Sequence, residues 1–260
     1  MLNRYDKEER IIEIFQEINR FKIKLFSNNF KTWWLFKSIY NKYIWKTWTN
    51  SSGKSELPPD YYNNKYRLMM DVMRIDDHAY EDENGKIINL HNERESKLTE
   101  ELISKNEAIR EIANAGRLFI TPFTGKLGRD DHNYERYVKN FKRVIEKHIR
   151  KIEKYKKNHT DFKMIFFIFD ESTPYMKLIN CDVPKKPGDL MHGELHYWWK
   201  DDNMLKVIKD SKIDYLIWFA PYKCIVKKID YPLAVIYDVS KINFDKNKNY
   251  EIDELESMEL

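Results

Sequence analysis

Three short runs of almost unbroken apolar residues dominate the second half of the chain. They lie at 163–170 (KMIFFIFD), 214–220 (DYLIWFA) and 232–238 (PLAVIYD). Runs of this length that are rich in Ile, Phe and Val are typical of strands buried on both faces. We therefore expect the three runs to be neighbouring strands of one sheet.

Segments with helical periodicity lie before the first of these runs and between the first and the second. Residues 133–157 predict one long amphipathic helix, and residues 201–211 predict a short helix between two of the strands. The apolar stripe of the long helix consists of Tyr134, Val138, Phe141, Ile145, Ile149 and Ile152. Buried strands separated by helices predict an α/β fold with a central mixed, partly parallel sheet flanked by helices.

The first part of the chain predicts an N-terminal helical element. Residues 5–24 and 30–48 have helical periodicity, and the Gly-, Ser- and Pro-containing segment 50–60 predicts a loop after them. We expect a helical element at 1–50, an α/β core domain at 61–245 and an acidic C-terminal tail at 246–260. Within the core domain, Asn84-Gly85 predicts a β-hairpin.

Composition narrows the class of protein. The 260 residues include two cysteines, Cys181 and Cys224, which are not in a CxxC pair, so a disulfide framework is not expected. The N-terminus is charged, and no apolar run approaches the roughly 20 residues needed to span a bilayer. We expect a cytoplasmic protein with no membrane association.

Basic residues gather on one face of the predicted 133–157 helix. A row of cations of this kind can neutralise phosphates, which predicts nucleic acid as a partner; the alternative is a solvated helix face. The candidate nucleic-acid-binding residues are Lys139, Lys142, Arg143, Lys147, Arg150 and Lys154. His148 lies on the apolar stripe instead, and we expect it to be a hydrogen-bonded core histidine.

Residues 30–48 interleave tryptophans with lysines. Aromatic rings between cations are typical of surfaces that bind single-stranded nucleic acid. The same pattern also fits core packing or a protein partner docking on residues 30–48.

Asp170 and Glu171 end the most apolar predicted strand. Carboxylates at the carboxyl end of a strand lie where open α/β sheets bind ligands, and paired carboxylates suit Mg²⁺ or Mn²⁺. The run also has the form of a Walker B strand, but Ile120 stands where the first Gly of GxxxxGK is required, so a nucleotide-triphosphate fold is not expected. The alternative is a turn at the strand end, with Asp170 as its cap.

A second candidate metal motif follows about twenty residues later. In an extended segment, His192, Glu194 and His196 point to one face and offer two imidazoles and a carboxylate. They predict further ligands to a divalent metal held by Asp170 and Glu171; the alternative is ordinary surface polarity.

A rival catalytic set combines Asp77 with Glu95 and Lys97. An acidic residue followed some twenty residues later by ExK resembles the order in PD-(D/E)xK nucleases, and Asp71 and Asp76 also precede the ExK. In that class the carboxylates bind Mg²⁺ and the lysine helps to activate water. However, residues 91–102 predict a helix, whereas the motif belongs on a strand.

Two functions remain from the sequence. The first is a metal-dependent enzyme acting on nucleic acid, most simply a nuclease using Mg²⁺ or Mn²⁺. The second is a non-catalytic protein that binds nucleic acid or another protein through the basic and aromatic helices. Convergence of the carboxylates in three dimensions separates the two.

Overall fold

The structure is a computed structural model that describes residues 8–27, 29–51, 59–107, 109, 133–179, 193–209, 211–223 and 231–258. Its centre is a seven-stranded mixed sheet in the order β1-β11-β10-β7-β4-β3-β2. In chain order the strands are β1 (Ile23–Leu25), β2 (Thr49–Asn50), β3 (Tyr61–Asn63), β4 (Leu68–Ile75), β7 (Lys163–Asp170), β10 (Tyr215–Phe219) and β11 (Ala234–Asp238).

The three apolar runs are adjacent strands, as the sequence predicts. β4, β7 and β10 are parallel, β11 returns antiparallel to β10, and β3 pairs antiparallel with β4. Residues 164–170 of β7 are fully buried because helices cover both faces of the sheet. The predicted α/β class with a partly parallel sheet is therefore confirmed.

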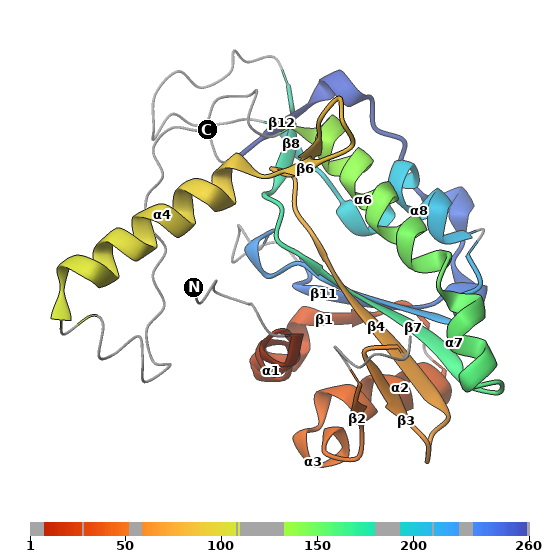
Figure 1. Ribbon diagram of the computed structural model, residues 1–260. Helices are drawn as coiled ribbons and strands as arrows, with labels where there is room; N and C mark the ends of the chain where they lie inside the picture. Colours follow the sequence, from red (N-terminus) through yellow and green to blue (C-terminus); the bar gives the residue numbers. More distant parts are fainter. Residues whose placement is uncertain are drawn as a thin grey trace.

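Helices form a layer on each side of the sheet (Figure 1). One face is covered by α6 (Tyr134–Ile149), α7 (Ile152–Asn158) and α8 (Asp202–Lys209). The other face is covered by α1 (Glu8–Glu17) and α2 (Phe30–Tyr40), which is followed by α3 (Lys42–Trp45). A further helix, α4 (Leu90–Lys105), extends away from the sheet. Short 3-10 turns occur at Arg20–Lys22, Trp198–Lys200, Pro221–Lys223, Val239–Lys241, Phe244–Lys246 and Ile252–Glu254.

The long helix expected at 133–157 is two helices, so that prediction was wrong in its continuity. Asn133 caps α6 by accepting a hydrogen bond from the Arg136 amide at 2.9 Å. α6 ends at Ile149, and α7 begins at Ile152. The apolar stripe still packs on the sheet, so the basic face continues from one helix to the next across the break.

The first and the last described segments of the chain join the core. Residues 1–50, expected as a helical element, also contribute β1 and β2 to the main sheet. In the acidic segment 246–260, β12 (Leu255–Ser257) pairs with β8 (Tyr175–Leu178), which also pairs with β9 (Gly193–Leu195). Leu255 and Ser257 are buried, so this part of the segment is packed rather than loose.

The predicted Asn-Gly hairpin is present. β5 (Tyr80–Glu81) and β6 (Ile87–Ile88) pair antiparallel, and Gly85 in the loop adopts a φ of 76°. Glycine suits this left-handed position because it has no Cβ to clash. None of the helices in the described ranges is long and apolar enough to cross a bilayer.

Candidate functional site

Asp170 lies at the carboxyl end of β7, and its hydrogen-bonding capacity is filled by the protein. Oδ2 accepts hydrogen bonds from Tyr137 Oη at 2.5 Å and Trp218 Nε1 at 2.9 Å. Oδ1 accepts from the Ser172 amide at 3.0 Å and from Ser172 Oγ at 2.5 Å. The bond to the amide two residues on is the turn cap that the sequence left open as the alternative.

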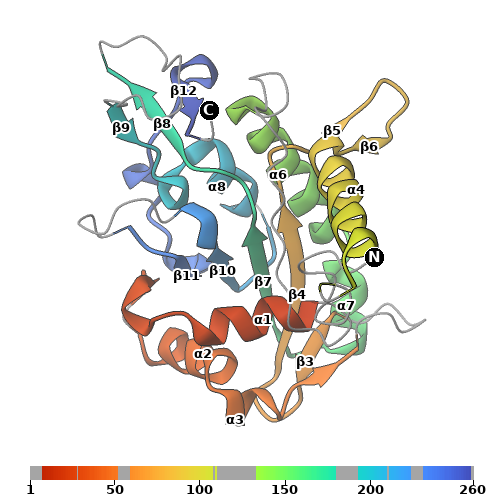
Figure 2. The same ribbon diagram turned by 90° about the vertical axis from the view of Figure 1, so that its left-hand side faces the viewer.

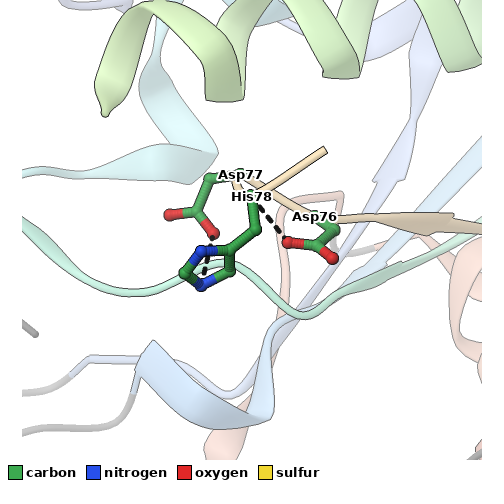
Figure 3. A group of neighbouring side chains, drawn as sticks. All are labelled: Asp76, Asp77 and His78. Carbon is green, nitrogen blue, oxygen red and sulfur yellow. Dashed lines mark hydrogen bonds and ion pairs between the residues drawn. The ribbon is translucent and has the colours of Figure 1, made fainter. Parts of the chain in front are cut away.

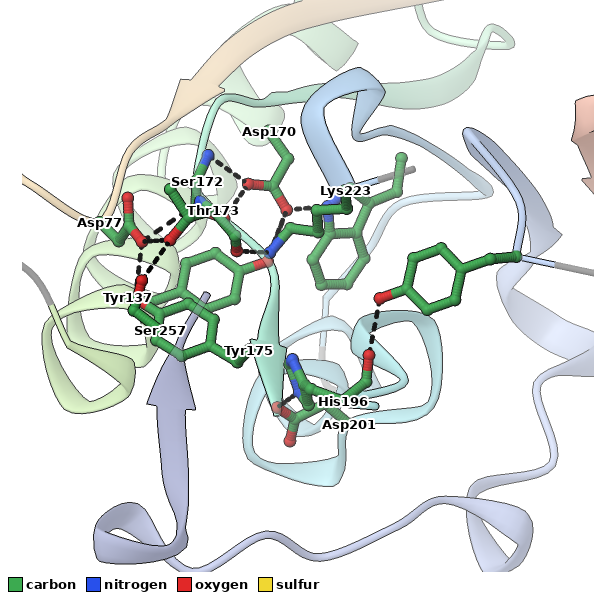
Figure 4. Close-up of polar contacts among 12 residues, drawn as sticks. Asp77, Tyr137, Asp170, Ser172, Thr173, Tyr175, His196, Asp201, Lys223 and Ser257 are labelled. Carbon is green, nitrogen blue, oxygen red and sulfur yellow. Dashed lines mark hydrogen bonds and ion pairs between the residues drawn. The ribbon is translucent and has the colours of Figure 1, made fainter. Parts of the chain in front are cut away.

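Lys223 is the cation of this cluster (Figure 4). Its Nζ lies 3.8 Å from Asp170 Oδ2, donates to the Thr173 carbonyl at 3.0 Å and lies 4.1 Å from the centre of the Tyr137 ring. Lys223 and Asp170 are both fully buried. Burial lowers the pKa of Lys223, while the charges of Asp170, Asp77 and Asp201 oppose that shift.

Two more buried carboxylates continue the network. Asp77 Oδ2 accepts from Tyr175 Oη at 2.6 Å and from Thr173 Oγ1 at 3.0 Å. Asp201 Oδ2 accepts from Tyr134 Oη at 2.6 Å and lies 2.8 Å from His196 Nε2. Burial lowers the pKa of His196, while Asp201 opposes the shift.

This buried polar network cannot take a substrate as it stands. Every charged member is buried and bonded to side chains from several elements, so the network joins α6, β7, β8 and the Pro221–Lys223 turn (Figure 4). A buried network of this kind fixes the relative positions of the elements that supply it. Two of its atoms, Asp77 Oδ1 and His196 Nδ1, have no hydrogen-bond partner among the described residues.

The other predicted metal ligands do not converge with Asp170. Glu171 forms a two-point ion pair with Arg74, with N–O distances of 2.7 and 2.8 Å. Glu194 is exposed on β9, His196 is buried against Asp201, and His192 lies outside the described residues. In the part of the chain that the structure describes, these donor atoms do not form a group that could hold a metal ion.

The rival ExK motif lies on α4, as its sequence context indicated. Lys97 is exposed on that helix, and the side chain of Glu95 lies outside what the structure describes. A helix does not align ExK side chains with an acid on a strand. Asp77 belongs instead to the buried network.

Asp77 also belongs to a compact acidic group after β4. The side chains of Asp76, Asp77 and His78 each offer a donor atom within 4.8 Å of the others (Figure 3). Burial raises the pKa of Asp76, and the charge of Asp77 raises it further. Asp76 Oδ1 and Oδ2 accept bonds from the His78 amide at 2.8 Å and Asn89 Nδ2 at 2.5 Å, so these oxygens are already engaged.

A second pair of carboxylates faces each other across β3 and β4. Tyr61 of β3 is opposite Met70 of β4, and one further step of this antiparallel register brings Asp60 opposite Asp71. Residues directly opposite across an antiparallel pair share a face of the sheet, with Cβ atoms about 5 Å apart. Asp60 Oδ2 also accepts from the Val72 amide at 2.7 Å, which fixes its carboxyl group against β4.

Charge repulsion and burial act together on this pair. The pKa of Asp60 is raised to about 8 by burial, by the charge of Asp71 and a hydrogen bond to it, and by the charge of Glu8 at the start of α1. Two close carboxylates disfavour double ionisation, so a proton stays between them near neutral pH. A cation placed there would satisfy the same demand.

Two side chains from the helical layer complete this second centre. His148 Nδ1 lies 2.5 Å from Asp71 Oδ2, and Tyr155 Oη lies 3.3 Å from the same oxygen. His148 is thus hydrogen-bonded and mostly buried, as expected for a core histidine, but its partner is a functional candidate. We call Asp60, Asp71, His148 and Tyr155 the carboxylate-pair site.

The basic helix face adjoins this site. His148 is on α6 and Tyr155 is on α7, so the α6–α7 break lies beside Asp71, and both helices run along the β4–β7 side (Figure 2). Lys147, Arg150 and Lys154 are exposed, and Lys142 and Arg143 are half-buried. Lys139 is exposed and pairs with Glu135 at 2.6 Å.

Sequence reasoning missed Asp60 and used Asp71 only as an acid preceding ExK. Residues 50–60 predict a loop, so the sequence did not indicate that Asp60 lies directly before strand β3. The available signal was Pro58-Pro59-Asp60, a turn, and then an apolar run containing Asp71. That order predicts a hairpin with one acid on each strand.

No protein-family model, no curated protein and no solved structure matches this chain.

Proposed function

We propose that this protein is a divalent-metal-dependent nuclease that holds its metal at the carboxylate-pair site. The observation that carries the proposal is the contact between Asp60 and Asp71; burial first, and then this contact, raise the pKa of Asp60 to about 8. Carboxylate oxygens are the ligands that Mg²⁺ and Mn²⁺ prefer, and a bound cation replaces the shared proton.

The arrangement of the two acids supports the reaction class. A Pro-Asp at the start of one strand, followed by an acid on the neighbouring antiparallel strand, resembles the PD-(D/E)xK order, with Pro59-Asp60 and Asp71 in the acidic positions. The metal in such a site lowers the pKa of bound water and stabilises charge on the phosphate. This chain departs from the pattern at Met73, which stands two residues after Asp71 where the class has its lysine.

The charge around the site supports a nucleic-acid substrate. The exposed Lys147, Arg150 and Lys154 flank the α6–α7 break in sequence, next to His148 and Tyr155. These three lysine and arginine side chains form no ion pair with any other described residue. Free cations beside a metal site can bind the phosphates that flank a scissile bond.

The test is cleavage of single- and double-stranded DNA and RNA in Mg²⁺, in Mn²⁺ and in chelator. We expect metal-dependent cleavage by the wild type and background cleavage by Asp60→Asn and Asp71→Asn. Asp161→Asn is the matched control, since Asp161 is an exposed carboxylate whose only role is an ion pair with Arg67 at 3.6 Å. Cleavage that survives both substitutions, or that needs no metal, would refute the proposal.

One observation favours a second function. Met73 is buried, so β4 supplies no lysine to activate water. A protein that binds nucleic acid and metal without cleaving it is the alternative. Wild-type binding that depends on Lys147, Arg150 and Lys154, with no cleavage in any metal, would favour this alternative.

A further inference from the structure

A pocket lies on the opposite face of the sheet from the carboxylate-pair site. It has a volume of about 490 Å³ and lies between α2 and the starts of β7 and β10. This volume falls within the range of small-molecule sites. The lining residues include Phe30, Lys31, Trp34, Tyr66, Lys163 and Asp238.

One wall of the pocket is aromatic. The rings of Phe30 and Trp34 are nearly parallel, with centres 6.4 Å apart and an interplanar angle of 11°. Tyr66 meets Trp34 edge-on at 5.5 Å. Phe30 is 75% exposed, which is unusual for a large apolar side chain next to a pocket. Flat, exposed rings of this kind bind planar π-systems such as nucleobases.

Two carboxylates, Asp214 and Asp238, also line the pocket. Asp238 Oδ1 accepts bonds from the Ser240 amide and hydroxyl at 3.2 and 2.6 Å. Oδ2 accepts one long bond, from Asn29 Nδ2 at 3.3 Å, so it retains acceptor capacity. Asp214 is engaged by Lys163 at 2.7 Å and by the Met164 amide at 2.9 Å. Asp238 is therefore the acceptor that a ligand can reach.

Cations lie at the rim. Lys31 is exposed at the first turn of α2, and the Lys163 side chain is 60% exposed. Both can contact a phosphate while their stems follow the apolar wall. The pocket thus combines a stacking surface, an acceptor for N–H donors and two cations.

We infer that this pocket binds a guanine nucleotide, either free or as an unpaired residue of a nucleic acid. The base stacks on Phe30 and Trp34, and its N1–H and N2–H groups both donate to Asp238 Oδ2, because Oδ1 already accepts two bonds from Ser240. Lys31 and Lys163 contact the phosphate. Guanine is chosen over adenine because its Watson–Crick edge carries two adjacent donors, whereas adenine offers one donor beside an acceptor.

The inference does not depend on the proposed nuclease activity. The Asp60→Asn/Asp71→Asn double variant, in chelator, retains nucleotide binding if the pocket acts by itself. If the double variant loses cleavage but still binds the nucleotide, the two sites act independently, and failure of one proposal can be distinguished from failure of the other.

The experiment is calorimetric titration of the full chain with GMP and AMP, in chelator. We expect GMP to bind about tenfold or more tightly than AMP, because a paired donor contact gives discrimination of that order. Trp34→Ala and Phe30→Ala should each weaken GMP binding about tenfold or more. Asp238→Asn should remove the preference for GMP while leaving AMP affinity within twofold.

Tyr43→Ala is the matched control. Tyr43 is an aromatic residue of α3 that is 83% exposed and does not line the pocket. Its substitution should change GMP affinity less than twofold, and circular dichroism checks that every variant is folded. The inference is overturned if the wild type does not bind GMP at millimolar concentration, if AMP binds as well, or if Tyr43→Ala and Trp34→Ala have equal effects.

Discussion

Replacing Asp60 with Asn probes the shared proton of the carboxylate-pair site. The substitution keeps the shape of the side chain and its acceptor oxygen for the Val72 amide. It removes the only charge that Asp60 can carry. In the wild type the folded-state pKa of Asp60 is raised from 3.8 to about 8, mainly by burial and then by Asp71.

The sign of the effect follows from proton binding. Between pH 3.8 and about 8 the folded state holds a proton on Asp60 that the unfolded state has lost. Folding stability contributed by this group therefore falls as the pH rises through that window and stops falling above the folded-state pKa. Asn cannot ionise, so the variant escapes this loss.

The loss of folding free energy has an upper limit set by the pKa shift, and solvent screening reduces the actual loss below that limit. About four pH units at 1.36 kcal/mol each give a ceiling of about 6 kcal/mol at pH 8. Asp60 is only partly buried, so solvent screening and local relaxation reduce the effect to about 1–2 kcal/mol. At pH 5 only about a quarter of this loss of stability has developed, because the pH has crossed about one of the four units between the unfolded-state and folded-state pKa values.

The assay is urea denaturation of wild type and Asp60→Asn at pH 5, 6, 7 and 8 in chelator. We expect the stability of the variant relative to the wild type to rise by about 0.8–1.5 kcal/mol across this range, which is three quarters of the full effect. Asp161→Asn serves as the control, and its difference from the wild type should stay flat because Asp161 is exposed.

In the presence of a divalent metal, the wild type rather than Asp60→Asn should be the more stable protein. At pH 8, Mn²⁺ at a hundredfold excess over its Kd stabilises a protein that binds it by about 2.7 kcal/mol. The wild type should gain this stability and Asp60→Asn should not. The assignment of a shared proton to Asp60 is refuted if the difference between wild type and variant does not change with pH, whatever its absolute value.

Three further predictions concern other parts of the molecule. Asp170→Ala should lower the free energy of unfolding by about 3–5 kcal/mol, because it leaves a buried lysine without its counter-charge. The decrease should be the same with and without Mn²⁺. A decrease near 1 kcal/mol would mean that Asp170 is only a turn cap. Burial lowers the pKa of His196, so below the ordinary histidine pKa of 6.5 the unfolded state binds more protons than the folded state, and stability should fall as the pH drops below that value. Between pH 7 and pH 5, denaturation should show a smaller drop in stability for His196→Gln than for the wild type. An equal drop would contradict the assignment. Replacing the three exposed cations beside the carboxylate-pair site with Gln should reduce the salt dependence of nucleic-acid affinity, with a slope smaller by about 0.9 for each phosphate that is no longer neutralised, and an unchanged slope would exclude that face. These three cations are Lys147, Arg150 and Lys154.

The sequence by itself determined three strands of the main sheet and the class of the fold. Strands β7, β10 and β11 follow from their apolar runs because a strand buried on both faces has no polar side to show. α6 follows from its stripe, with Tyr137, Phe141 and Ile145 on the buried side. Local periodicity is set by local geometry, so it can be read without knowledge of the partners.

The break at residues 150–151 and the pairing of residues 255–257 with β8 could not be predicted in this way. The apolar spacing runs on through the break, so only the fit of α7 on the sheet places it. The acidic composition of the last residues favours solvent, but Leu255 and Ser257 find a strand partner far away in sequence. Composition gives no information about that partner.

Only the tertiary structure decided which carboxylates are fully hydrogen-bonded and which one faces another carboxyl group. Asp170 and Asp71 both lie on buried strands, and the sequence ranks Asp170 higher because it ends its strand. In the fold, Tyr137, Ser172 and Trp218 satisfy Asp170, whereas Asp71 faces a second carboxyl group across an antiparallel register. Hydrogen-bond satisfaction and charge repulsion depend on distances of a few ångströms between elements far apart in the chain, and those distances are fixed only when the helices pack onto the sheet.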